Sequence, residues 1–358
     1  MSNYIEYNDT IAFHPGYYIK EIIDESGLTQ EDFAKRLDTT PKNISLLVRG
    51  EQKLSIDIAM KLSRMIGTSV SYWLNLQNAY DALVAEHKLE DELVKERIVF
   101  GYLDYKYFEE EYGLPHLPRQ VDEQIKRVRE YFNVATLSAL TKRDMSVKFR
   151  SSTGNLPVKS IVKANAMVQI AVNMALKVDA PKFNKSKFEK AVSYALTLTE
   201  NHDKFYPMIY NAFMEAGVIF IILPNLPGSN VNGATKKVGE KIMLMVNDRR
   251  LNADSFWFTL LHEIGHILNG DYGISFEKET GEEEILADRF AEDSLIPKEE
   301  YARFIEQNKF DLGTIRKYAR KINRDPGIVL GRLQNDGYVD YNDWTLKSLR
   351  KKYQIVKR

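Results

Sequence analysis

The sequence predicts a mainly α-helical chain with a small α+β part. Apolar residues recur at helical spacing over most of its 358 residues. Two short β-rich runs interrupt this pattern late in the chain, GVIFIILP (Gly217–Pro224) and KIMLMVND (Lys241–Asp248). We expect helical regions over residues 1–82 and 83–205, an α+β domain over 206–311, and a helical segment over 312–358.

The composition restricts the class of protein. A hydrophobic content of 44% is enough for two or three cores. Fifty basic and fifty acidic residues cancel, so the chain is not a polycation that would coat nucleic acid without selectivity. Because there is no cysteine, a disulfide scaffold, a thiolate zinc site and a cysteine nucleophile are excluded. With no signal pattern and no long uncharged apolar run, we expect a cytoplasmic protein that does not enter a membrane.

The first 82 residues predict five short helices. The first, GYYIKEIIDESG, ends at Gly27. Thr29 is a suitable N-cap for the second, and Asp32, three residues later, can complete the capping pair. Thr40 caps the third helix, which has Pro41 at its first position, where a missing N–H costs nothing. SIDIAMKLSRMIG and SVSYWLNLQNAYD provide the last two.

The second and third helices have the layout of a helix-turn-helix, in which the second of the pair enters the major groove of DNA. Asparagine can read adenine there, and arginine or lysine can read guanine. Gln30, at the start of the first helix of the pair, is placed to hold a phosphate. The residues that would face outward from the second helix are Lys42, Asn43, Ser45, Leu46 and Arg49.

The charge of this region indicates modest DNA affinity. Residues 1–80 contain eight Lys/Arg and ten Asp/Glu, a net charge of −2. Any basic footprint must therefore be local, and we expect a homodimer on double-stranded operator DNA. The alternative is a helical bundle used only for dimerisation.

Two segments, HPGYYIKEIIDESGLTQEDFAKRL and ISLLVRGEQKLSIDIAMKLSRMIGTSVSYWLNLQNAYD, resemble the helix-turn-helix of HigA-type antitoxins, a branch of the lambda-repressor-like family. The resemblance implies a DNA-binding domain that binds operators as a dimer and often represses its own operon.

Beyond this region the pattern changes from helices to strands. Residues 83–205 have charged, aromatic helical patterns without recognisable chemistry. Between the two β-rich runs, LPGSNVNGATKKVGE predicts a loop and a third, more polar strand. We expect the strand around Asn232–Val238 to lie at the edge of the sheet and to bind an extended peptide through main-chain hydrogen bonds. A plain hairpin connection is the alternative.

The stretch FWFTLLHEIGHILNGD (Phe256–Asp271) predicts a metal-binding helix. Residues four apart lie on one face of a helix, so His262 and His266 can bind one Zn²⁺ ion. Glu263, offset by one residue, would lie beside the ion, where it can take a proton from a water molecule and return it to a leaving amine. A buried helix with two unrelated histidines is the alternative.

A second predicted helix, GEEEILADRFAEDSLIP, supplies candidates for a third ligand. Glu284 and Asp288 are four residues apart and therefore share a helix face. This spacing allows Glu284 to bind the metal ion while Asp288, one turn later, orients a histidine. Asp288 as the third ligand stays open as an alternative.

Three segments, GVIFIILPNLPGSNVNGATKK, FWFTLLHEIGHILNGD and EEEILADRFAEDSLIP, resemble the ImmA/IrrE family of zinc metallopeptidases. The resemblance implies a gluzincin-like domain with His262, His266 and Glu284 as zinc ligands and Glu263 as general base. Members of this family cut repressor proteins or promote their cutting, often from a chain that also carries a HigA-like helix-turn-helix. Several residues remain candidates for stabilising the transition state, namely Tyr272, His202, Tyr301 and Arg332.

The C-terminal segment TIRKYARKINRDPGIVLGRLQNDG repeats the pattern of the first helix-turn-helix, with Pro326 at the position of Pro41. A basic tail, LKSLRKKYQIVKR, follows it. We interpret residues 312–358 as a packing subdomain of helix-turn-helix shape, and a second DNA contact is the alternative.

These patterns together predict a DNA-binding transcriptional regulator fused to a zinc-dependent endopeptidase. Its substrate would be a repressor or a toxin–antitoxin partner protein. The alternative is a non-enzymatic, antitoxin-like repressor whose peptidase fold senses a ligand or binds a partner.

Overall fold

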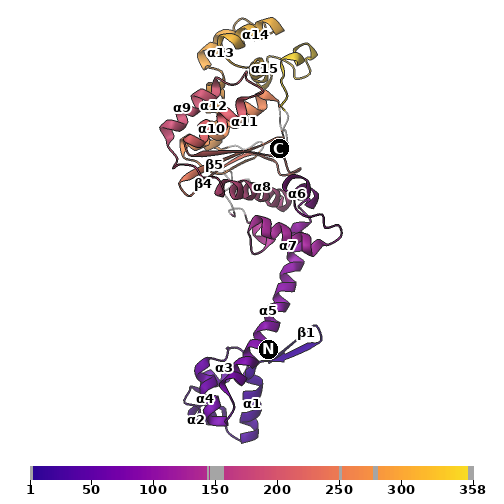
Figure 1. The fold of residues 1–358 in the computed structure, drawn as a ribbon, viewed down its shortest axis with the longest axis vertical. Coiled ribbons are helices and arrows are strands. Elements are labelled where there is room, and N and C mark those ends of the chain that lie inside the picture. The colour runs from indigo at the N-terminus through magenta and orange to yellow at the C-terminus, as the bar shows by residue number, and fades with distance from the viewer. Residues whose placement is uncertain (1–2, 143–144, 146–156, 250–251, 277–280, 354–358) are drawn as a thin grey trace. The chain divides into compact units, whose positions relative to one another are not determined.

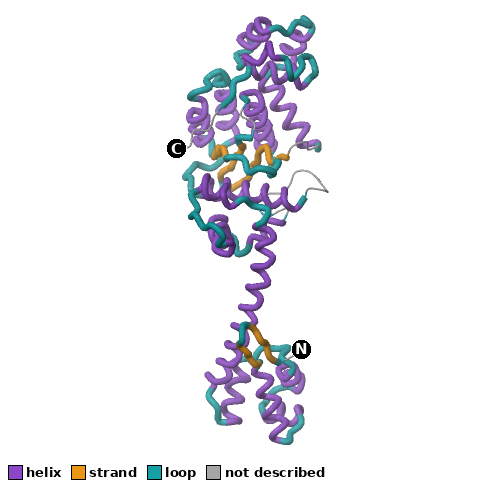
Figure 2. Tube along the Cα trace, turned by 90° about the vertical axis from the view of Figure 1, so that its right-hand side faces the viewer, coloured by secondary structure: helices purple, strands orange, loops and turns teal. Residues whose placement is uncertain are grey.

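The computed structural model describes residues 3–142, 145, 157–249, 252–276 and 281–353. The chain forms two compact units, divided between Lys95 and Glu96 (Figure 1). The predicted fold class, mainly helical with small sheets, is confirmed (Figure 2).

The first unit begins with a β-hairpin that the sequence patterns did not predict. Strands β1 (Tyr4–Tyr7) and β2 (Thr10–Phe13) pair antiparallel, with Tyr7 opposite Thr10. Only Asn8 and Asp9 connect them, and both have a positive φ, 47° and 58°. Two left-handed residues in a two-residue loop match the twist of a hairpin, and Asn and Asp tolerate that conformation better than most residues.

Two of the helices in this unit begin at the N-cap residues that the sequence predicts, Thr29 and Thr40. The helices of the unit are α1 (Pro15–Ser26), α2 (Gln30–Arg36), α3 (Pro41–Val48), α4 (Ile56–Ile66) and α5 (Val70–Phe100). Thr29 Oγ1 accepts the N–H of Asp32 at 3.1 Å and donates to its carboxylate at 2.8 Å. Thr40 Oγ1 accepts the N–H of Asn43 at 3.2 Å. The starts of α2 and α3 are therefore fixed by local hydrogen bonds.

The predicted inner faces of α2 and α3 form the core of the unit, together with residues of α1, α4 and α5. Phe33, Ala34, Ile44 and Leu47 are fully buried. Gly16 permits α1 to lie directly on α3, since a β-carbon there would fall 1.7 Å from the carbonyl oxygen of Leu47. This close contact holds α3, the second helix of the helix-turn-helix, in one orientation against α1.

The prediction of a short fifth helix was wrong. Helix α5 has 31 residues, and its C-terminal part belongs to the second unit. No glycine or proline occurs between Val70 and Phe100, so nothing local stops the helix at the expected boundary.

The second unit is built on a four-stranded sheet of β3 (Val218–Leu223), β4 (Val231–Val238), β5 (Lys241–Asn247) and β6 (Ile274–Phe276), in the order β3-β5-β4-β6. β3 is parallel to β5, and the other pairs are antiparallel. The three predicted strands are confirmed. The predicted edge position of Asn232–Val238 was wrong, because β6 pairs with the first half of β4 and takes the edge.

Helices cover both faces of this sheet, which explains why β3 and β5 are buried along nearly their whole length. Helix α8 (Val158–Leu176) packs on one face (Figure 1). Helices α10 (Phe205–Glu215) and α11 (Ala253–Asn269) pack on the other, with α9 (Lys185–Leu196) behind them. The elements that precede α8 are α6 (Tyr105–Tyr112), α7 (Val121–Phe132) and the 3₁₀ helix η1 (Leu137–Thr141).

The C-terminal elements share the core of α11. They are α12 (Glu282–Leu295), α13 (Lys298–Ile305), α14 (Leu312–Lys321), α15 (Pro326–Asn335) and the 3₁₀ helix η2 (Trp344–Leu349). Gly331 brings α15 close to α11, because a β-carbon there would lie 2.7 Å from Asp254. The interpretation of residues 312–358 as a packing subdomain stays a prediction. Within the described ranges, no helix has the length and apolar character needed to cross a bilayer.

Candidate functional site

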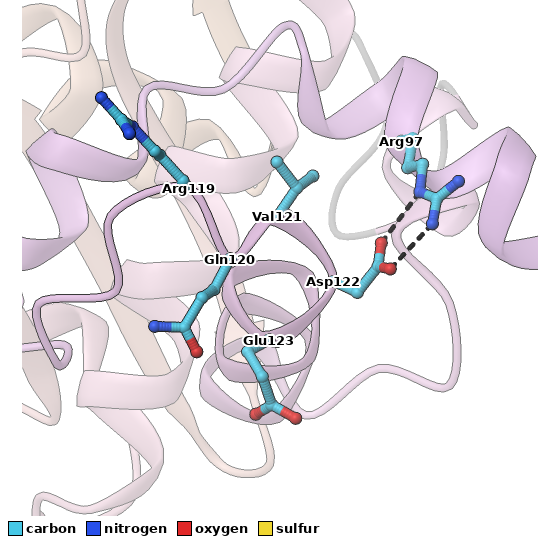
Figure 3. Close-up of a pocket in the computed structure, with 6 residues that line it drawn as sticks. All are labelled: Arg97, Arg119, Gln120, Val121, Asp122 and Glu123. Carbon is cyan, nitrogen blue, oxygen red and sulfur yellow. Dashed lines mark hydrogen bonds and ion pairs between the residues drawn. The ribbon is translucent and has the colours of Figure 1, made fainter.

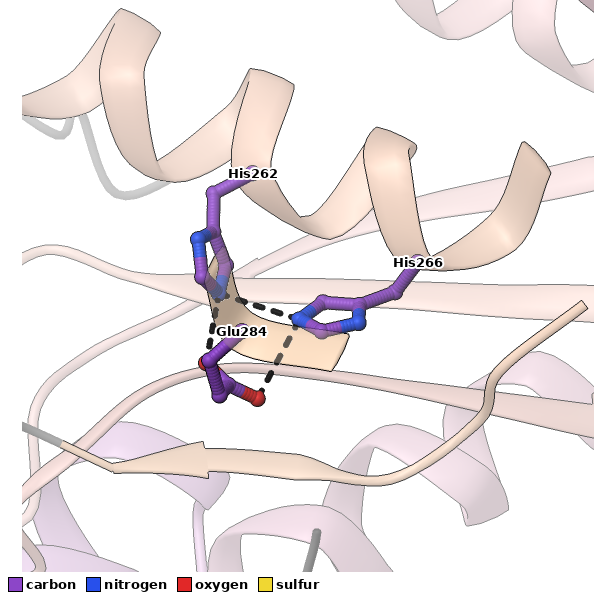
Figure 4. A group of neighbouring side chains, drawn as sticks. All are labelled: His262, His266 and Glu284. Carbon is purple, nitrogen blue, oxygen red and sulfur yellow. Dashed lines mark hydrogen bonds and ion pairs between the residues drawn. The ribbon is translucent and has the colours of Figure 1, made fainter. Parts of the chain in front are cut away.

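Helix α11 carries both predicted histidines. Its apolar residues form one side of the core, and Gly270 ends the helix in the left-handed conformation. His262 and His266 are one turn apart, and both rings point toward Glu284 (Figure 4). Helix α12 carries Glu284 and can lie close because Gly265 has no side chain; a β-carbon there would be 3.2 Å from the Cα of Ala287.

The three side chains converge on one point. The Nε2 atoms of His262 and His266 are 3.0 Å apart. The carboxylate of Glu284 lies 3.1 Å from His262 Nε2 and 3.4 Å from His266 Nε2. All three residues are buried, and Glu284 Oε1 makes no hydrogen bond within the part of the chain that the structure describes. Two imidazole nitrogens and a carboxylate are a donor set that suits Zn²⁺, so these residues fit a zinc ion.

The outer nitrogen of each imidazole is held by an aspartate. Asp288 Oδ1 lies 2.8 Å from His262 Nδ1, and Asp271 Oδ2 lies 2.8 Å from His266 Nδ1. Each carboxylate favours the tautomer with its proton on Nδ1, which leaves Nε2 as the lone-pair donor. The sequence patterns pointed to Asp288 but missed Asp271. The sequence offers only a weak indication of Asp271, namely that it directly follows Gly270, the glycine that ends α11.

The charges of this group favour a bound cation. Burial lowers the pKa of His262, but contacts with the carboxylates of Asp288 and Glu284 outweigh burial and raise that pKa to about 10. Burial raises the pKa of Glu284, but its contacts with both histidines outweigh burial and lower that pKa to about 2. The carboxylates around the histidines thus create a negative potential, which a divalent cation would balance better than a single proton.

The predicted general base lies against the sheet. Glu263 is fully buried, and its side chain occupies the space in front of Gly233 on β4. A β-carbon at Gly233 would be 2.5 Å from Glu263 Oε1 and 2.6 Å from its Cγ. The pairing of β4 with β6 shifts register between Val231 and Gly233, which marks a bulge at this point. A small recess opens nearby, lined by Asn232, Val246, Asn247, Phe256 and Thr259.

The four residues that the sequence offers as candidates for stabilising the transition state do not share one environment. His202 Nε2 is 3.1 Å from Asp325 Oδ2, and its other ring nitrogen is 3.3 Å from the hydroxyl of Tyr353. Tyr301 donates to Asp336 at 2.8 Å, and Arg332 pairs with the same carboxylate at 2.7 Å. The His202–Asp325 pair joins the start of α15 to the segment before α10, whereas Tyr301 and Arg332 make their contacts among the C-terminal helices. Tyr272, which follows Asp271, is half-buried and has a pKa raised by burial.

A second recess lies beside the start of α7 (Figure 3). Arg97 forms a bidentate pair with Asp122 there, at 2.8 and 2.7 Å. Two arginines and two acidic residues line it together, so neither an anion nor a metal ion would find a set of ligands of one charge. Its lining residues are Arg97, Arg119, Gln120, Val121, Asp122 and Glu123.

The predicted DNA-contacting residues lie on α3 and its C-cap, except Gln30, which is the first residue of α2. Gln30 and Lys42 are exposed. Asn43 is tied to its neighbours: its Nδ2 donates to Thr39 Oγ1 at 2.9 Å, and its Oδ1 accepts from Gln52 Nε2 at 2.6 Å. Arg49 Nη1 donates to Ser45 Oγ at 2.7 Å, and Leu46 is half-buried.

Comparisons with known proteins agree with the two-part architecture. Residues 19–73 match the helix-turn-helix family, and residues 219–321 match the IrrE N-terminal-like domain. The uncharacterized helix-turn-helix-type transcriptional regulator YddM of Escherichia coli is 38% identical over 76 residues, which are 21% of this chain and 81% of YddM. Virulence-associated protein I of Dichelobacter nodosus is 36% identical over 80 residues, 22% of this chain and 74% of that protein.

A crystal structure of a candidate antidote protein of a plasmid maintenance system from Nostoc punctiforme is 32% identical to this chain, covering 24% of this chain and 94% of that one, with a TM-score of 0.22. Through its first unit, the chain belongs to the helix-turn-helix transcriptional regulators. In the second unit this regulator carries an IrrE-like peptidase domain, of a family that is typically metal-dependent.

Proposed function

We propose that this regulator is a zinc-dependent endopeptidase that cuts a protein partner, either a repressor or a component of a toxin–antitoxin pair. The observation that carries the proposal is the buried convergence of His262, His266 and Glu284, with the carboxylate of Glu263 on the same helix. The match to the IrrE N-terminal-like domain supports the same chemistry.

Each residue would have a separate role. The Nε2 atoms of His262 and His266 and the carboxylate of Glu284 would hold the zinc ion. When bound, zinc would polarise a water molecule and the scissile carbonyl. Glu263 would accept the proton of the attacking water on its carboxylate and pass it to the leaving amine. Asp288 and Asp271 would keep both imidazoles in the ligating tautomer.

The substrate would bind as an extended segment along the free edge of the sheet. Among the described strands, β6 occupies that edge next to β4, which carries Gly233. Main-chain hydrogen bonds to an edge strand fix the direction and register of a peptide without demanding a particular sequence. This arrangement would present a scissile bond to the base Glu263.

The helix-turn-helix would bind operator DNA as a homodimer. In this proposal Lys42, Asn43, Ser45 and Arg49 face the major groove, and Gln30 contacts a phosphate. Dimerisation doubles the contacts of a unit whose own charge is low. DNA binding would either hold the peptidase at its target locus or repress the regulator's own operon.

The direct test incubates the purified full-length chain with repressor and antitoxin proteins encoded at the same locus, with and without zinc. We expect cleavage by the wild type in the presence of zinc and none by Glu263→Gln. Zinc binding without any cleavage would instead favour the alternative, an antitoxin-like repressor whose peptidase fold binds a partner.

A further inference from the structure

The guanidinium of Arg49 is held in one orientation by two neighbours. Arg49 is the C-cap residue of α3, and its side chain is 53% exposed. Its Nε and Nη2 atoms donate to the two carboxylate oxygens of Glu51, each at 3.0 Å. Its Nη1 donates to Ser45 Oγ at 2.7 Å. Glu51 therefore makes a bidentate pair with one edge of the guanidinium, and Ser45 fixes the other side.

The remaining donors of Arg49 suit a base rather than a phosphate. A guanidinium has five N–H groups, and Glu51 and Ser45 together take three, which leaves one on Nη1 and one on Nη2. Two N–H groups from an arginine can bind O6 and N7 of guanine together in the major groove. A phosphate would be repelled by the nearby carboxylate of Glu51, whereas the uncharged edge of a guanine would not.

From this arrangement we propose that Glu51 is a specificity-determining positioning residue, which holds Arg49 for bidentate contact with one guanine in each half-site. The proposal deepens the DNA-binding part of the proposed function and depends on it. Because the arginine is ordered before it meets DNA, less side-chain freedom is lost on binding. Glu51 also cancels the charge of Arg49, so discrimination at this position comes from hydrogen bonds rather than from general attraction to DNA.

The test begins with the preferred sequence of the full-length wild type, selected from a random duplex library. Binding is then measured to that duplex with each guanine replaced in turn by adenine or by 7-deazaguanine, which lacks the N7 acceptor. We expect one guanine per half-site whose replacement weakens wild-type binding by about 5- to 150-fold. Arg49→Ala should abolish this preference.

Glu51→Gln is the decisive variant, since it keeps the shape of the side chain but loses one acceptor and the charge. We expect the preference for that guanine to fall at least several-fold, while the thermal stability of the unit stays close to that of the wild type. Glu25→Gln, an exposed position on α1, removes the same charge and serves as the matched control. It should leave the preference for every base unchanged.

Two results would overturn the proposal. If Glu51→Gln tightened binding to all duplexes equally and left every base preference intact, Glu51 would only repel DNA. If Glu51→Gln changed nothing, the Arg49 pair would be an ordinary exposed salt bridge. Failure of the wild type to select any sequence would be a distinct outcome, because it would remove the DNA-binding function on which the proposal depends.

Discussion

The contact between Gly233 and Glu263 allows a quantitative test of how the sheet holds the candidate general base. In Gly233→Ala, the new β-carbon would lie 2.5, 2.6 and 2.7 Å from Oε1, Cγ and Cδ of Glu263, all well inside ordinary contact distance. Glu263 is fully buried, so either its side chain or strand β4 has to move. Overpacking of this kind costs about 1–3 kcal/mol. In a unit that spans residues 96–358, 1 kcal/mol corresponds to about 2 °C, so the midpoint of thermal unfolding should fall by about 2–6 °C.

A double-mutant cycle separates this contact from other effects of adding a methyl group to a strand. Calorimetry would compare the wild type, Gly233→Ala, Glu263→Ala and the double variant. If the side chain of Glu263 causes the strain, Gly233→Ala should cost at least about 1 kcal/mol less in the Glu263→Ala background. An equal cost in both backgrounds would refute the reasoning, because Gly233 would then be required for the backbone of the bulge alone.

Three further predictions concern the metal ligands and the core of the first unit. His262→Ala should bind no zinc, whereas dialysis with metal analysis should find about one ion per wild-type chain. Asp271→Asn should weaken zinc binding about 10- to 100-fold in a chelator competition, since His266 loses its carboxylate partner; unchanged affinity would contradict this role. Gly16→Ala should unfold the first unit and abolish DNA binding, because its β-carbon would overlap Leu47 O at 1.7 Å; circular dichroism checks this, and a folded, DNA-binding variant would be the contrary result.

The grouping of His262, His266 and Glu284 could be predicted because it depends on helical periodicity. The two histidines share a face of α11, and Glu284 shares a face of α12 with Asp288. Only the packing of the two helices had to be assumed. The sequence pattern left Glu284 and Asp288 as alternatives; in the structure Glu284 lies beside both Nε2 atoms, and Asp288 contacts Nδ1 of His262.

Other parts of the site depend on chain reversals and strand register that no local pattern encodes. Asp271 reaches His266 because the chain turns back after Gly270. The niche at Gly233 depends on which residue of β4 faces α11, and a shift of one residue would have reversed the face. Strand β6 has only three residues, too few for an alternating pattern, so the edge of the sheet was assigned to the wrong strand.

In the first unit the caps were predictable and the side-chain networks were not. Thr29 and Thr40 fix the starts of α2 and α3 through contacts within three residues. Arg49 and Glu51 pair just beyond the end of α3. Each side chain has several possible rotamers there, and the sequence does not indicate which one the folded chain adopts. Outward-facing positions could therefore be named from the sequence, but the orientation of the groups that would read DNA could not.

The most direct test of the central claim is a comparison of new protein N-termini, by mass spectrometry, in cells expressing the wild type or Glu263→Gln at equal levels. We predict at least one new N-terminus within a repressor or toxin–antitoxin protein, present with the wild type and absent with Glu263→Gln. The same set of N-termini in both cultures would contradict a peptidase function for this regulator.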